Sequence, residues 1–233
     1  MLRARLAERL QDLLLDNDAL EDFLRQLAAL AAEFAAAETG RPVLCSVRLA
    51  RRRQLKVVAG SSPEALILDS LQDCMSEGPG LEAGQAGLAV LVPDTTMDPR
   101  WRRYQRAAAQ RGNRSILAVT LLADRDATAV LTFSSTSPEA FDDDAVAACA
   151  ALAVRAAKVV RLAVRLDSAQ GLNRDLLQAM RSRTASAPQA ATAPSSKASG
   201  DVDEKVKTAV ASRSASRVTA RTLRFPRWAA ARW

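Results

Sequence analysis

Two apolar, β-rich runs separated by a short charged segment constrain the fold more than any other feature of this sequence. The runs cover residues 115–122 and 127–134, and the segment between them includes residues 124–126 (DRD). This pattern is typical of two antiparallel strands joined by a tight turn. Because both runs are apolar, we expect the pair to lie at the centre of a sheet.

The other apolar patterns predict helices and further strands around this pair. Apolar residues recur every three or four positions from Leu2 to Phe34, which indicates helix. An interruption is expected at residues 16–18 (DND), with Asp18 as the cap of the second helix. Further predicted elements are strands at 43–50, 54–59 and 88–92, helices at 63–75 and from 98 to about 111, a short helix at 81–83, and a long helix from 142 to about 181. This order predicts an α+β fold, an antiparallel sheet flanked by helices.

The composition changes sharply after Thr184. Residues 1–184 hold 24 basic and 23 acidic side chains, whereas residues 185–233 hold 9 and 3, so most of the formal charge of +7 belongs to the tail. Residues 186–200 are rich in alanine and serine and carry too little apolar surface to offset the entropy of ordering, which predicts disorder. A basic tail attracts polyanions such as nucleic acid or anionic lipid without specifying which, and an inert solvated extension is the alternative.

The sequence contains no histidine, which excludes many catalytic and metal sites. Serine–histidine and cysteine–histidine nucleophile pairs, histidine-ligated haem and the usual zinc sites all need that side chain. Cys45, Cys74 and Cys149 are widely spaced among apolar neighbours, which predicts buried free thiols in a reducing cytosol. Asp94 and Asp98 resemble a carboxylate pair, but the prolines beside them favour turns and a helix cap. We therefore expect no enzyme activity, no metal and no cofactor.

The N-terminus and the apolar runs indicate a cytoplasmic protein with no membrane segment. Met1 leads directly into an amphipathic pattern, so no signal peptide is expected. The apolar run at residues 145–154 has about half the length that a membrane span needs.

The stretch from residue 77 to residue 87 is rich in glycine but lacks both the GxGxxG and the Walker patterns. We expect it to form turns at a corner of the sheet. The backbone at residues 78–80 is a conceivable site for a phosphate group, although no residue requires one there.

Several short motifs give the sequence a resemblance to the GAF domain family and, more narrowly, to the actinobacterial GAF–ANTAR regulators. They are residues 77–83 (EGPGLEA), 92–94 (VPD), 98–101 (DPRW), 114–119 (RSILAV) and 141–142 (FD). The resemblance covers roughly residues 18–165 and implies a GAF-like sheet flanked by helices. Gly80 and Thr120 stand where the family usually has cysteine and proline, which argues against a thiol switch at position 80.

The ANTAR half of the resemblance is incomplete. In that family a coiled-coil helix enters a three-helix RNA-binding module through a motif resembling L-x-x-A-x-x-S-R, which Leu176, Ala179, Ser182 and Arg183 fit. The apolar helices that should follow are missing, so the ANTAR part is interpreted as truncated or degenerate after Thr184. The resulting division of the chain is an N-terminal helix at 1–17, a GAF domain at 18–165, a coiled-coil linker and the start of an ANTAR-like segment at 166–184, and a basic tail at 185–233.

The resemblance implies a signal-sensing transcription regulator. Its GAF domain would bind an unknown small molecule and form a homodimer through the flanking helices, and its C-terminal part would bind RNA in antitermination. The alternative is a dimeric GAF interaction module that has lost RNA binding. A ligand pocket is expected between the sheet and the helix near Trp101, with ordinary core packing as the alternative for its residues. The candidate ligand-binding residues are Leu81, Val92, Asp94, Trp101, Tyr104 and Leu117, and the candidate RNA-binding residues are Arg181 and Arg183.

Overall fold

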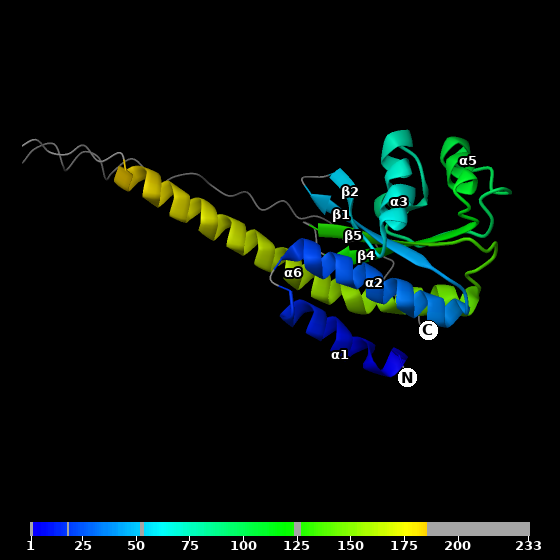
Figure 1. The fold of residues 1–233 in the computed structure, drawn as a ribbon, viewed down its shortest axis with the longest axis horizontal. Coiled ribbons are helices and arrows are strands. Elements are labelled where there is room, and N and C mark those ends of the chain that lie inside the picture. The colour runs from blue at the N-terminus through cyan, green and yellow to red at the C-terminus, as the bar shows by residue number, and fades with distance from the viewer. Residues whose placement is uncertain (1, 18, 52–53, 124–126, 186–233) are drawn as a thin grey trace, which may run out of the picture. The chain divides into compact units, whose positions relative to one another are not determined.

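The computed structural model describes residues 2–17, 19–51, 54–123 and 127–185. Within them, six helices and five strands follow one another along the chain (Figure 1). They are α1 (Leu2–Leu15), α2 (Leu20–Thr39), β1 (Leu44–Arg51), β2 (Gln54–Gly60), α3 (Pro63–Met75), α4 (Pro79–Ala86), β3 (Val90–Val92), α5 (Arg102–Gln110), β4 (Ser115–Ala123), β5 (Ala127–Ser135) and α6 (Asp143–Ala185).

The five strands form one antiparallel sheet in the order β2-β1-β5-β4-β3. The predicted hairpin is confirmed, because β4 pairs with β5 along its whole length and β5 is the central strand. On its other side β5 pairs with β1, where Val47 lies opposite Leu131. The backbone groups of this central strand are therefore satisfied by two neighbours, as burial on both faces requires.

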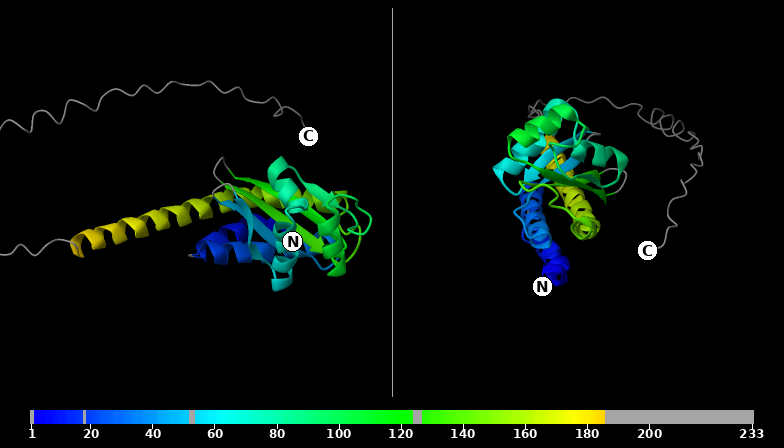
Figure 2. Two further views of the ribbon diagram at one scale, coloured as in Figure 1. Left: turned by 90° about the horizontal axis from the view of Figure 1, so that it is seen from above. Right: turned by 90° about the vertical axis from the view of Figure 1, so that its right-hand side faces the viewer.

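Helices cover both faces of this sheet (Figures 1 and 2). On one face α2 and α6 lie side by side, and α1 packs against both of them. On the other face α3, α4 and α5 form a second layer, with α3 over β1 and β2 and α4 over β4 and β5. The predicted fold class, an antiparallel sheet flanked by helices with a long C-terminal helix, is confirmed.

The layer between the sheet and α2 and α6 is the larger core, and most of its side chains are aliphatic. Leu27, Leu131 and Leu152 are fully buried there, together with the two cysteines of β1 and α6, Cys45 and Cys149. Aromatic side chains are scarce in this sequence, and one close ring contact in this layer joins Phe133 to Phe141, with centroids 6.5 Å apart. Alanines on the buried sides of both helices allow close approach to the sheet.

Helix α6 changes character along its length. Its first half contributes Leu152, Ala156 and Val160 to the core. In the described part beyond Ala163 its leucines are exposed, with Leu172 at 66% and Leu176 at 64% of full exposure. Figure 1 shows this second half extending past the edge of the sheet. The predicted long helix is confirmed, but only its first half belongs to the core.

Two helices on the other face begin at residues different from those predicted. The short helix expected at 81–83 starts at Pro79 and contains Gly80 and Gly84, so the glycine-rich stretch forms helix rather than turns. The helix expected from Asp98 starts at Arg102, because residues 94–101 form a compact loop with its own hydrogen bonds.

The predictions for the cysteines, the helix cap and the tail have different outcomes. Cys74 is exposed on α3 rather than buried, whereas Cys45 and Cys149 are buried as expected. Asp18, the expected helix cap, and the tail at 186–233 lie outside the described residues. Of the helices in the part of the chain that the structure describes, none is long and apolar enough to span a membrane.

Candidate functional site

The sheet face under α3, α4 and α5 carries an unusual number of buried polar side chains. In β1 the alternation that buries Cys45 and Val47 against α2 turns Ser46 and Arg48 to this opposite face. Because helices cover both faces, these polar groups are buried as deeply as the apolar ones. The buried polar residues of this layer are Ser46, Arg48, Asp69, Gln72, Thr132 and Ser134.

Arg48 is the centre of this group and is fully buried. Its Nε lies 3.0 Å from Oδ2 of Asp69, and its NH1 lies 2.9 Å from Oδ1 of Asp73. NH2 also donates to the main-chain oxygen of Asp69 at 2.8 Å. One guanidinium on β1 therefore holds two carboxylates of α3 and ties that helix to the sheet.

Burial and ion pairing act on the charges of this cluster in opposite directions. Burial raises the pKa of Asp69, and the nearby Arg48 opposes this shift without cancelling it. Burial lowers the pKa of Arg48, but the carboxylates of Asp69 and Asp73 outweigh that effect and leave it raised. The guanidinium is therefore charged at every accessible pH, and Asp69 depends on it for its own ionisation.

Gln72 carries the connection from α3 to α4. Its Nε2 donates to Oδ1 of Asp69, and its Oε1 accepts from the main-chain N–H groups of Gly80 at 2.7 Å and Leu81 at 3.3 Å. These N–H groups belong to the first turn of α4, where a helix has no partners of its own for them. The side-chain amide of Gln72 thus occupies the main-chain N–H groups that would otherwise be available to a phosphate at this helix end.

Close packing explains the glycine at position 80. A Cβ built on Gly80 would lie 2.9 Å from Oγ1 of Thr132 and 3.1 Å from both amide atoms of Gln72. Any larger residue there would push α4 away from β5 unless these side chains moved. A cysteine, which is usual in the family at this position, would therefore crowd Thr132 and the amide of Gln72.

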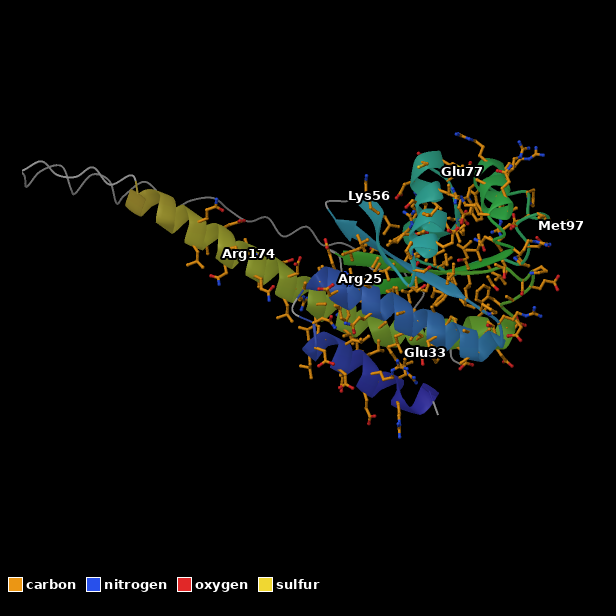
Figure 3. All side chains as sticks on the ribbon, in the orientation of Figure 1. Arg25, Glu33, Lys56, Glu77, Met97 and Arg174 are labelled. Carbon is orange, nitrogen blue, oxygen red and sulfur yellow. The ribbon has the colours of Figure 1, made fainter. Side chains whose placement is uncertain are left out.

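Glu77 connects the end of α3 to α5. Its carboxylate accepts from the main-chain N–H groups of Arg103 at 3.0 Å and Tyr104 at 3.1 Å, in the first turn of α5 (Figure 3). Trp101, directly before this helix, adopts a left-handed backbone conformation with φ of 45°. The guanidinium of Arg100 lies 4.7 Å from the centre of the Trp101 ring.

Asp94 organises the loop between β3 and α5. Its two oxygens accept from Arg114 at 2.7 and 3.2 Å, and Oδ1 also accepts from the N–H and hydroxyl groups of Thr96. These hydrogen bonds hold the pKa of Asp94 well below its usual range. Its carboxylate is therefore already occupied by contacts within the chain.

The structure brings some of the candidate ligand-binding residues together and separates others. Val92 and Tyr104 pack with Ile116 in a small core, and Trp101 lies against it. Leu81 is half-buried on α4, next to the Gln72 contacts. Leu117 is on the opposite face of the sheet, in the core under α2 and α6. Arg181 and Arg183 lie in the last turns of α6, and their side chains are outside the description.

Sequence reasoning missed the three residues that link the helices to the sheet, Arg48, Asp69 and Gln72. The alternation of Cys45 and Val47 placed Arg48 on the opposite face of its strand, and the pattern did not show that helices bury this face too. Once the face is buried, the guanidinium needs a carboxylate. Among the described residues there is no group of histidine, cysteine or carboxylate side chains placed to hold a metal ion.

Comparisons with known proteins agree with this architecture. A family model described as GAF domain matches residues 17–161. No curated protein matches the chain. The narrower resemblance to GAF–ANTAR regulators stays a prediction.

Three solved structures illustrate the likeness of the fold. The GAF domain of a phosphoenolpyruvate-protein phosphotransferase from Acinetobacter is 19% identical with a TM-score of 0.51, over 72% of this chain and 98% of that one. The corresponding domain from Coxiella burnetii is 14% identical with a TM-score of 0.51, over 72% and 96%. Free methionine-R-sulfoxide reductase from Neisseria meningitidis is 19% identical with a TM-score of 0.51, over 71% and 89%. At these identities the likeness concerns the fold alone.

The role of Arg48 can be tested by unfolding in urea. Arg48→Met leaves Asp69 buried without its cation, and we expect it to lower the free energy of unfolding by about 3–5 kcal/mol. Arg48→Met combined with Asp69→Leu removes both buried charges and is expected to recover most of that loss.

The matched control is Arg25→Met, which removes an exposed ion pair with Asp22 and should change the free energy of unfolding by no more than about 1 kcal/mol. A double variant that is as unstable as Arg48→Met would show that the ion pair is not what Arg48 contributes.

Proposed function

Because the chain belongs to the GAF domain family, we propose that it is a signal-sensing dimer of the GAF–ANTAR type, which regulates transcription by binding RNA through its C-terminal part. The observation that carries this proposal is the division of α6. Its first half is part of the core, and its second half presents apolar side chains to solvent. Such a helix is suited to join a sensing domain to a partner copy and to an output segment.

The exposed part of α6 has the spacing of a coiled coil. Its pattern alternates steps of three and four residues, the repeat of a helix that packs along a second helix. The seam starts at Val159, which is half-buried against the core, and continues through the exposed residues Leu162, Leu166, Ala169, Asn173 and Leu176. In the heptad repeat, the β-branched Val159 and the polar Asn173 occupy a positions. Leu162 and Leu176 occupy d positions. In parallel two-stranded coiled coils, a single asparagine at the position that β-branched residues favour fixes the register and the oligomeric state.

A parallel seam suits signalling, since it brings the two C-terminal segments of a dimer to the same end. Arg181 and Arg183 follow the seam on the last turns of α6. Their charges, with the basic residues of 185–233, would contact RNA phosphates. We therefore propose that dimerisation through the flanking helices places two such segments together for RNA binding.

We propose a sensing rather than a catalytic role for the domain. The thiolate is the reactive form of cysteine. Burial raises the pKa of Cys149 to about 12 and raises that of Cys45 well above its ordinary value. Both thiols also lie in the core under α2 and α6, on the face opposite the Arg48 cluster. At neutral pH they are protonated and enclosed, so they suit packing and not thiol chemistry.

The second candidate function is a dimeric GAF interaction module without RNA binding. It is favoured by the sequence after Thr184, which lacks the apolar helices of an ANTAR module. The two functions share the α6 dimer and differ only in selective RNA binding, so they are tested separately.

The dimer is tested with Leu166→Gln combined with Leu176→Gln in the full chain. Because both substitutions place an amide in the apolar seam, we expect sedimentation velocity to show a monomer where the unaltered chain is a dimer. Val154→Gln combined with Leu88→Gln changes apolar residues that lie outside the seam and are at least as exposed, and it should leave the dimer intact. A monomeric unaltered chain, or a seam variant that stays dimeric, contradicts the proposed interface.

RNA binding is tested by selecting ligands for the full chain from a random RNA pool. The selected RNA should bind more tightly than its scrambled form. We expect Arg181→Gln combined with Arg183→Gln to weaken binding and to reduce the slope of log affinity against log salt by roughly 1.4, the value for two single-strand phosphate contacts.

Arg174→Gln is the matched control for RNA binding, because Arg174 is exposed earlier on the same helix (Figure 3). It should leave the affinity and the salt slope nearly unchanged. Failure to enrich any RNA, or equal affinity for the scrambled RNA, would favour the module without RNA binding.

A further inference from the structure

A groove of about 960 Å³ lies between α5 and the loop that precedes it. Thr95, Met97 and Pro99 line it from the loop, and Arg102, Gln105 and Arg106 line it from the helix. Met97 is 79% exposed at the far edge of the molecule, on the loop beside α5 (Figure 3). The groove lies on the side of α5 away from Tyr104, which packs inward against the sheet. Its size is within the range of small-molecule sites.

The loop wall of the groove is held in place by contacts within the chain. The main-chain N–H of Thr95 donates to the oxygen of Arg114 at 2.8 Å, and the Thr95 hydroxyl donates to the oxygen of Asn113 at 2.7 Å. Asp94 accepts from Thr96, and Asp98 accepts from the main-chain N–H of Arg100 at 2.9 Å. The groove is therefore formed before any ligand arrives.

Gln105 is the residue that distinguishes this groove from an ordinary surface depression. It is 97% buried, yet its Oε1 and its Nε2 have no hydrogen-bond partner among the described residues. Neither atom is exposed to solvent, so the side chain has to turn before a ligand in the groove can reach its amide. Burying an amide without partners is costly, which favours this turn once a partner outside the protein is available. A primary amide offers one acceptor and one donor on the same edge.

The charge of the groove is positive. Arg102 and Arg106, one turn apart on α5, are exposed and form no ion pair within the described part of the chain. The acidic residue that lines the groove, Asp98, is paired with Arg100, which holds the pKa of its carboxyl low. The two free guanidinium groups thus leave an excess positive charge beside the Gln105 amide.

We infer that this groove binds a small anion that also carries a planar donor–acceptor edge, such as a lactam, an imide or a ureido group. The Gln105 side chain turns toward the groove and its amide pairs with this edge through two hydrogen bonds. The anionic group lies between Arg102 and Arg106. Met97 and Pro99 cover the ring of the ligand. This inference deepens the proposed sensing function, and it places the signal on the outer side of α5.

Three planar probes of similar size separate the two elements of recognition. Orotate carries both an imide edge and a carboxylate, uracil carries the edge alone, and benzoate carries the anion alone. In an NMR titration of the full chain, we expect orotate to shift the side-chain amide signals of Gln105 and the main-chain signals of residues 95–98. Uracil and benzoate should bind at least about tenfold more weakly.

Two variants and one matched control locate the site. Gln105→Met should weaken orotate binding about tenfold while leaving the thermal unfolding midpoint unchanged or higher, because it removes a buried amide without protein partners. Arg102→Gln with Arg106→Gln should weaken orotate and leave uracil unaffected. Arg103→Gln, on the same helix but outside the groove, should change neither.

Several results would overturn the inference. They are binding of orotate no tighter than that of uracil and benzoate, signal changes at the Arg48 cluster instead of the groove, and a Gln105→Met variant that melts earlier and binds as before. Because the titration reports on the groove itself, its failure is distinguishable from loss of the dimer or of RNA binding.

Discussion

The buried ion pairs of Arg48 hold together the layer of helices on one face of the sheet. Arg48 fixes α3 to β1 through Asp69 and Asp73. From Asp69 the contact continues to Gln72, whose amide caps the first turn of α4. At the end of α3, Glu77 caps α5 in the same way. Two helices, α4 and α5, are thus positioned by Gln72 of α3 and by Glu77 just after it, and α3 is positioned by one guanidinium. Removing that charge would leave the buried carboxylate of Asp69 without its cation.

This arrangement also decides where a ligand can bind. The space between the sheet and α3, α4 and α5 is filled by Arg48, Gln72 and Tyr104, all fully buried. The donors at the start of α4 are occupied by Gln72. A groove with unused hydrogen-bonding groups lies instead on the outer side of α5. The two faces of the sheet therefore differ in chemistry. The face under α3, α4 and α5 carries a buried polar cluster, whereas the described residues of the core under α2 and α6 form no comparable cluster.

The pattern of apolar residues was sufficient to predict most of the elements and the fold class. Periods of two and of three to four residues identify strands and helices, and α6 was found at nearly its full length. The same pattern could not show that Cys74 is exposed, because its apolar sequence neighbours lie on other sides of α3. It also placed Leu117 with Trp101, whereas alternation along β4 turns Leu117 to the opposite face and Ile116 toward the helices.

The candidate site was harder to predict than the fold, for a physical reason. Gln72 and Gly80 are eight residues apart and meet only because α3 and α4 fold back on each other, and no local propensity encodes that contact. The ion-pair partner of Arg48 could not be predicted either. From the sequence alone, the guanidinium could equally have been solvated by water or paired with a carboxylate of α3. The amide of Gln105 is unpaired because none of its described neighbours in the fold offers a hydrogen-bond donor or acceptor. Those neighbours cannot be predicted from the local sequence.

The helix layer over the Arg48 face depends on Gln72 filling the end of α4, and amide hydrogen exchange measured by NMR tests this most directly. Gly80 and Leu81 lie in a first helical turn, where main-chain N–H groups have no partner within the helix. If Gln72 caps them, their exchange should be as slow as that of the paired amides of β5, and Gln72→Leu should release them selectively. Rapid exchange at Gly80 and Leu81 in the unaltered chain, with β4 and β5 still protected, would show that this interior is open and would contradict the account.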